Sequence, residues 1–127
     1  MQPSFKLERY EIISCSYMRN EVEGDYQGSI RFDPIIQKDE GDPNNIRVEI
    51  KTTVGGLADI ELTIAGYFTS TSLVDGENIN EAMLFSGLHL LIPYIRSYIH
   101  TISCQDGRPP VMIPVINVID LLKTEEQ

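Results

Sequence analysis

Few residues in this chain of 127 could carry out chemistry, and their spacing assembles no reactive site. His89 and His100 are the only histidines. On one helix they would lie about three turns apart, too far to share a metal ion without help from elsewhere. Cys104 would share a helical face with His100, but no third group is evident to orient the pair. We interpret both histidines as surface or capping residues, and Cys15 and Cys104 as reduced thiols.

Motifs for nucleophilic catalysis, phosphate binding and calcium binding are absent as well. The chain has no Gly-x-Ser-x-Gly, and Gly55-Gly56 fits a hairpin turn better than either phosphate-binding glycine pattern. The Asp39–Asp42 loop lacks the alternating oxygen ligands and the terminal Glu of a calcium loop. We therefore expect no catalytic residue, no metal, no cofactor and no enzymatic activity. An enzyme with two carboxylates brought together in space stays open as a third hypothesis.

The net charge of −9 points away from nucleic acid and from anionic membranes, because both are bound by a basic face. No charged segment followed by an apolar stretch opens the chain, and its apolar runs are far shorter than a bilayer requires. We expect neither a signal peptide nor membrane insertion, and hence a cytoplasmic protein. At this length we expect a single domain over residues 1–127.

The first half of the chain has the pattern of strands. We expect a strand at Tyr10–Tyr17, and a second at Tyr26–Phe32 that Asp33-Pro34 ends. The clearest alternation of apolar and polar residues runs through Ile46–Val54 and, after the double glycine, through Ile60–Phe68. This pair predicts an antiparallel hairpin with one apolar and one polar face.

The second half of the chain changes to a helical period. Apolar residues recur at steps of three or four from Leu84 to Ile102, after a possible capping residue at Asn78. Pro93 falls inside this pattern and should kink the helix or begin a second one. Gly107 and the prolines after it end the helix. The apolar segment Val111–Leu122 is expected to be extended first and helical near its end.

These elements predict an α+β protein, with a four-stranded antiparallel sheet and a long kinked helix and a short C-terminal helix on one face. The main helix is apolar almost all round from Leu84 to Ile95. A domain of this size has little room to bury both sides of such a helix. The second side is therefore expected to meet another subunit or a client.

Three motifs in the second half occur together and in order. They are Pro93–Arg96 (Pro-Tyr-Ile-Arg) in the helix, Gly107–Pro110 after it, and Ile113–Asn117 closing on Asn. Upstream, Ile60–Phe68 contains a Glu and then a Gly followed by an aromatic pair. In this order and approximate spacing, the segment from Ile46 to Leu122 resembles the SecB family of tetrameric export chaperones.

The resemblance implies a dimer of dimers in which the main helices meet, and long apolar grooves that hold unfolded polypeptides. It also implies the translocation ATPase SecA as a possible partner. Residues expected at the oligomer interface are Glu61, Tyr94, Ile95, Arg96 and Ile99. Residues expected in the client-binding groove are Phe32, Leu57, Tyr67, Phe68, Ile116, Val118 and Ile119.

Our leading hypothesis is an ATP-independent holdase that binds unfolded or nascent polypeptides, with protein export as one setting. The Cys-Pro-Asn that often precedes the helix motif in the family is replaced here by Ser86–His89. Some SecB-like proteins serve toxin–antitoxin systems, so a chaperone of an antitoxin is an alternative. A small-molecule binding protein that uses a cavity between sheet and helix is a second alternative.

Overall fold

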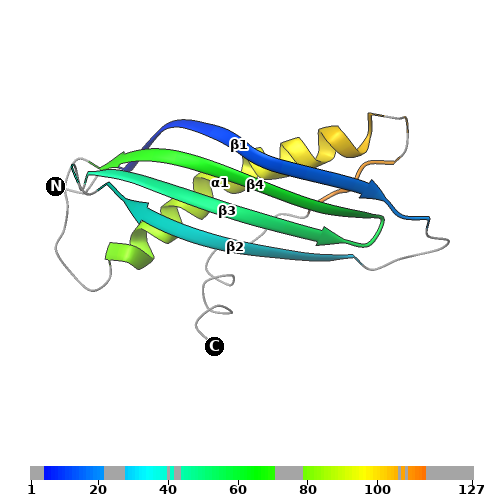
Figure 1. Ribbon diagram of the computed structural model, residues 1–127, viewed down its shortest axis with the longest axis horizontal. Helices are drawn as coiled ribbons and strands as arrows, with labels where there is room; N and C mark the ends of the chain where they lie inside the picture. Colours follow the sequence, from blue (N-terminus) through cyan, green and yellow to red (C-terminus); the bar gives the residue numbers. More distant parts are fainter. Residues whose placement is uncertain are drawn as a thin grey trace.

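A four-stranded antiparallel sheet with one long helix behind it makes up the fold (Figure 1). The computed structural model describes residues 5–21, 28–39, 41, 44–70, 79–105, 107 and 109–113. The elements are β1 (Phe5–Arg19), β2 (Ser29–Lys38), β3 (Asn45–Gly55), β4 (Ala58–Ser70) and α1 (Ile79–Ser103). The strand order is β1-β4-β3-β2, so β1 and β2 form the two edges. The predicted α+β class and antiparallel sheet are confirmed.

The central hairpin of β3 and β4 has the predicted apolar and polar faces. Ile46 pairs with Phe68 at one end and Val54 with Ile60 at the other. The alternate residues of both strands that point toward α1 are buried, whereas Glu61 on the opposite face is exposed. The period-two pattern of the sequence therefore identified the buried face correctly.

The two edge strands are longer than predicted. β2 does not end at Asp33-Pro34 but continues to Lys38, with Pro34 opposite Ile50. Proline is tolerated there because β2 is an edge strand, where a missing donor need not break the ladder. β1 extends beyond Tyr10–Tyr17 at both ends, and its register shifts twice along β4. Such irregularities break the alternation that would otherwise reveal the full strand.

α1 is one continuous helix with Pro93 inside it, so a second helix does not begin at that proline. Pro93 is exposed, and its ring occupies the side of the helix away from the sheet's core. The predicted capping residue Asn78 and the predicted C-terminal helix near residues 118–122 lie outside the described residues.

Two glycines allow α1 to lie close to the sheet. A Cβ atom on Gly66 of β4 would come within 2.9 Å of Leu91 Cδ2. A Cβ atom on Gly87 of α1 would come within 3.1 Å of Val48. Larger side chains at either position would push the helix away. The core between helix and sheet is formed by Phe32, Ile46, Val48, Ile50, Val54, Ala58, Ile60, Leu62, Ile64, Phe68, Leu88, Leu91, Ile92, Ile95, Ile99, Val111 and Ile113.

The buried side of α1 leads to a prediction about stability. Ile95 and Ile99 are both 0% exposed within the single chain. Ile95→Asp or Ile99→Asp would bury a carboxylate without a partner, which costs at least about 3 kcal/mol. We expect loss of the cooperative unfolding transition in circular dichroism. Ser97→Asp, an exposed position on the same helix, should unfold near the wild-type temperature. Equal stability of all three variants would contradict this packing.

Candidate functional site

An apolar hollow lies beside the turn between β3 and β4, on the side of the sheet that faces α1. After α1 the chain returns behind the sheet, and residues 109–113 form one wall of the hollow (Figure 1). The end of the β2–β3 pair and Leu57 form the other wall. The hollow measures about 440 Å³. Its lining residues are Gly28, Ser29, Ile30, Val54, Gly55, Leu57, Pro110, Val111, Met112 and Ile113.

Two large apolar side chains at this hollow face water. Met112 is 70% exposed and Leu57 is 37% exposed. Val111 and Ile113, on either side of Met112, are buried in the core. The side chains of this wall therefore point alternately inward and outward, as they do in a strand. The flexible thioether of Met112 faces the solvent. A concave surface with exposed Leu and Met side chains is suited to binding apolar groups of varied shape.

The residues predicted for the groove do not lie together in the structure. Leu57 lines the hollow, whereas Phe32 and Phe68 are buried in the core at 6% and 1% exposure. Tyr67 lies on the opposite face of the sheet. Ile116, Val118 and Ile119 lie outside the described residues.

Met112 was missed because methionine is common in cores and a single sequence does not show which side of an extended segment faces out. Its place between two aliphatic residues that are both buried was the available signal.

The residues predicted for an oligomer interface are also divided. Ile95 and Ile99 pack inside their own chain. Glu61 lies on the face away from α1 and forms an ion pair with Lys51 at 4.0 Å. Tyr94 is 42% exposed, beside β1, with its ring centroid 4.5 Å from that of Tyr10.

Arg96, the fourth residue of the helix motif, donates from Nε to the carbonyl of Ile113 at 3.1 Å. It therefore ties the wall of the hollow to α1. This contact gives the Pro-Tyr-x-Arg motif a physical role within one chain.

The open face of the sheet carries a polar network centred on Tyr67. The Tyr67 hydroxyl donates to Glu11 Oε1 at 2.6 Å and accepts from Arg47 Nε at 3.3 Å. Arg47 also donates to Glu49 at 2.6 Å, and the guanidinium of Arg9 lies 3.8 Å from the centre of the Tyr67 ring. The Tyr67 hydroxyl is the main cause that lowers the pKa of Glu11, with Arg9 and Arg47 adding to it. The same hydroxyl, with Glu49, raises the pKa of Arg47.

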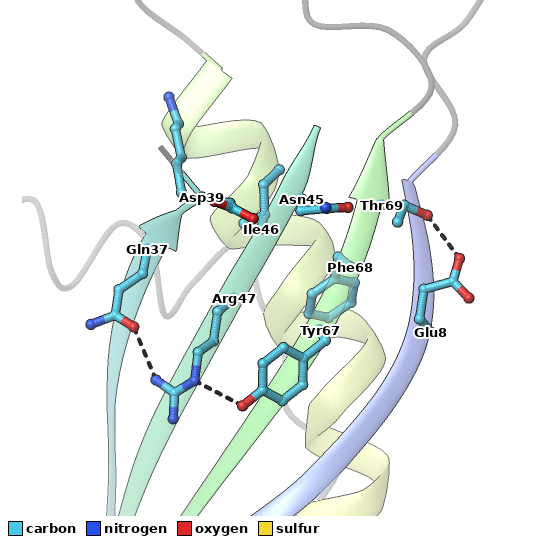
Figure 2. A pocket seen from close by; sticks show the side chains of 10 residues that line it. Glu8, Gln37, Asp39, Asn45, Ile46, Arg47, Tyr67, Phe68 and Thr69 are labelled. Carbon is cyan, nitrogen blue, oxygen red and sulfur yellow. Dashed lines mark hydrogen bonds between the residues drawn. The ribbon is translucent and has the colours of Figure 1, made fainter. Parts of the chain in front are cut away.

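A second pocket of about 410 Å³ lies at the end of the sheet near this network. Figure 2 shows Glu8 and Asp39 at opposite ends of it, with Asn45 and Thr69 between them. Glu8 accepts a hydrogen bond from Thr69, and Arg47 donates to Gln37 (Figure 2). The polar groups of this pocket are occupied by one another. They do not form a close pair of carboxylates.

Other reactive side chains show no activated arrangement in the part of the chain described here. Cys15 and Cys104 are free, and partial burial raises the pKa of the Cys15 thiol. The Cys104 sulfur lies 3.5 Å from the carbonyl of Thr101, as in a helix-end contact. Among the described residues, no three His, Cys, Asp or Glu side chains lie close enough to hold a metal ion.

None of the helical residues described here forms a stretch with the length and apolar character needed to cross a membrane.

Comparison with known proteins identifies the fold. No family model matches the chain. A SecB-like chaperone from Mycobacterium tuberculosis, solved with a peptide from an antitoxin, superimposes with a TM-score of 0.74 over 89% of this chain and 91% of that one. The protein has the SecB-like fold. The sequence identity to that chaperone is 17%, so the similarity establishes the architecture and no more.

Two further proteins are similar to this chain. An uncharacterized protein from Methanocaldococcus jannaschii is 26% identical, over 98% of this chain and 86% of that protein. A protein of unknown function from Streptococcus agalactiae is 11% identical and superimposes with a TM-score of 0.60, over 91% of this chain and 100% of that one. The resemblance to SecB that the motifs suggested is confirmed at the level of the fold.

The Tyr67 network of this SecB-like fold predicts a pH effect. Tyr67→Phe removes the donor to Glu11, so the pKa of Glu11 should rise toward its usual 4.5. A lowered folded-state pKa contributes stability above the unfolded pKa, which is lost as the pH falls through the folded value. The variant should therefore lose less stability on acidification than the wild type. An NMR titration of the Glu11 carboxyl carbon measures the shift. Tyr94→Phe, on the other face, should leave it unchanged; an unshifted pKa in Tyr67→Phe would contradict the assignment.

Proposed function

We propose that this protein is an ATP-independent chaperone that holds unfolded or nascent polypeptide segments in the hollow between residues 109–113 and the end of the β2–β3 pair. The observation that carries the proposal is the exposure of Leu57 and Met112 in that hollow, within a SecB-like fold. Folded monomers rarely leave large apolar side chains together in a concave surface without a binding role.

The shape and chemistry of the hollow favour an extended chain over a small molecule. It is partly open to solvent and lined mainly by aliphatic groups and backbone. Contacts of this kind give affinity through buried area, about 25 cal/mol per Å² of apolar surface, with little discrimination between sequences. The net charge of −9 would favour segments that carry basic residues. A specific small ligand would instead require free, convergent polar groups, and in the second pocket Arg47 is hydrogen-bonded to Gln37 and Thr69 to Glu8.

Assembly into a homo-oligomer is part of the proposal. β1 is an edge strand without proline, and Tyr10, Ile12, Ile13 and Met18 along it are 40–65% exposed. Tyr94 extends this apolar surface onto α1. A second copy paired along β1 would cover these side chains. It would also form hydrogen bonds with the backbone groups of the edge strand, which otherwise promote aggregation. Two such dimers would give the tetramer that the family resemblance implies.

The setting that we propose is the cytoplasm, with an antitoxin or other nascent protein as client. The SecB-like chaperone of Mycobacterium tuberculosis binds an antitoxin peptide. We favour this setting over export with SecA because of the charges on the open face of the sheet. Its cations pair with its acids in Arg9–Glu11, Arg31–Asp33, Arg47–Glu49 and Lys51–Glu61, so much of its negative charge is neutralised before any basic partner arrives.

A test of holding activity follows the aggregation of a urea-unfolded polypeptide by light scattering after dilution. The protein at stoichiometric excess should suppress scattering without ATP. Leu57→Asp combined with Met112→Asp should lose most of this effect, because two charges in the hollow oppose apolar contacts. Ile35→Asp is the matched control, since Ile35 is 54% exposed on another strand. Unchanged aggregation with the wild type would refute the proposed function.

The proposed assembly is tested by multi-angle light scattering. The chain has a mass of 14.4 kDa. The wild type should have about four times this mass as a tetramer, or about two times this mass if only the dimer is stable. Ile12→Lys combined with Ile13→Lys should reduce the mass, because charges on an edge strand oppose pairing. Ile35→Lys, on the other edge, should keep the wild-type mass. A monomeric wild type at micromolar concentration would contradict the assembly.

A further inference from the structure

The wall formed by residues 109–113 is held in place by side chains. Within the described residues, no backbone hydrogen bond joins this segment to a strand of the sheet. Val111 and Ile113 pack in the core, and the hydrogen bonds of the segment come from side chains of α1 and of the end of β1. The position of the wall, and with it the width of the hollow, therefore depends on a few side-chain donors and acceptors.

Ser103 is the first of these side chains. It is 0% exposed, and its hydroxyl donates to the carbonyl of His100 at 3.0 Å. The same oxygen accepts from the backbone amide of Val111 at 2.7 Å. This bond fixes Val111 with its side chain in the core. Because side chains alternate along an extended segment, it also directs Met112 outward.

Arg19 is the second, and it joins three parts of the molecule. From the last position of β1, its Nη2 donates to the carbonyl of Pro109 at 3.0 Å. Its Nη1 lies 3.4 Å from both the carbonyl of Ser103 at the end of α1 and the hydroxyl of Tyr17. A guanidinium is well suited to this position, because it offers several donors in a fixed plane and interacts favourably with the carbonyl end of a helix.

We propose that Arg19 and Ser103 are positioning residues that set the client-binding wall of the hollow. Arg96 supports them by holding the carbonyl of Ile113. Neither Arg19 nor Ser103 lines the hollow, so both act through the segment that they hold. The proposal rests on the proposed function, since it assigns the determinants of client affinity at that same site. Without these contacts, Met112 and Ile113 can shift. Binding of a client then has to order the wall, and the affinity for the client falls.

The experiment uses the full-length chain and a fluorescein-labelled, acid-free peptide of fifteen leucine, serine and lysine residues. Fluorescence anisotropy measures its affinity, and hydrogen exchange measures the protection of the Val111 and Ile113 amides. We expect Arg19→Met and Ser103→Ala to bind the peptide about tenfold more weakly and to exchange these two amides faster. The amides of β3 should keep their protection, which separates a loosened wall from general unfolding.

Two further variants control for charge. Arg31→Met removes an arginine whose partner is Asp33, away from the hollow, and should bind the peptide like the wild type. Arg19→Lys keeps the charge but loses the planar group, and should fall between Arg19→Met and the wild type. If Ser103→Ala fails to fold, the Arg19 variants decide, because Arg19 is only half-buried.

The outcomes separate this proposal from the proposed function. If the wild type binds the peptide and Arg19→Met binds it with equal affinity, only the proposed role of Arg19 and Ser103 at the wall is overturned. Unchanged exchange at Val111 and Ile113 does the same, because the contacts would then not hold the segment. A wild type that binds no peptide overturns the proposed function and this proposal together.

Discussion

Burial of one side of α1 against one face of the sheet is the interaction on which the remaining structure depends. Leu88, Leu91, Ile95 and Ile99 form an unbroken buried stripe along the helix. Gly66 and Gly87 let the backbones come close enough for these side chains to pack against the sheet. The helix crosses the sheet diagonally (Figure 1), so it contacts all four strands but does not cover all of the apolar face.

The part of the sheet that the diagonal helix leaves uncovered contains the surfaces that we propose for binding. At the end of the β3–β4 hairpin, residues 109–113 return over the sheet, and two of their side chains enter the core. The hollow beside them is the remainder of that face. Beside β1, the uncovered part carries Tyr10 and Tyr94, the surface that we propose for self-association. Both surfaces follow from one cause, which is a single helix too narrow for a four-stranded sheet.

The other face of the sheet is covered by charged and polar side chains. Its charges are paired along and across strands, and Tyr67 links Glu11 with Arg47. These groups are exposed or half-buried, so each pair contributes little to stability. Their effect is to keep this face hydrated and nearly neutral. Exposed apolar side chains lie elsewhere, at the hollow and along β1.

The sequence by itself determined the class of fold, the central hairpin and the helical spacing of apolar residues in the main helix. These depend on local periodicity, which is visible wherever alternation or helical spacing is regular, as at Ile46–Val54 and Leu84–Ile102. The family motifs also led to the correct fold, although no family model matches. The edge strands were underestimated, because bulges in β1 and Pro34 in β2 break the local pattern.

Only the tertiary structure decided which apolar residues remain at the surface. Phe32 and Phe68 were predicted as groove residues but lie in the core, and Met112, for which the sequence predicted no role, faces out. The pairing of Arg19 with Pro109 and Ser103 joins residues that are more than eighty positions apart, and no local pattern predicts it. The physical reason is that burial and long-range hydrogen bonds depend on how the helix crosses the sheet, and that crossing is a property of the packed molecule.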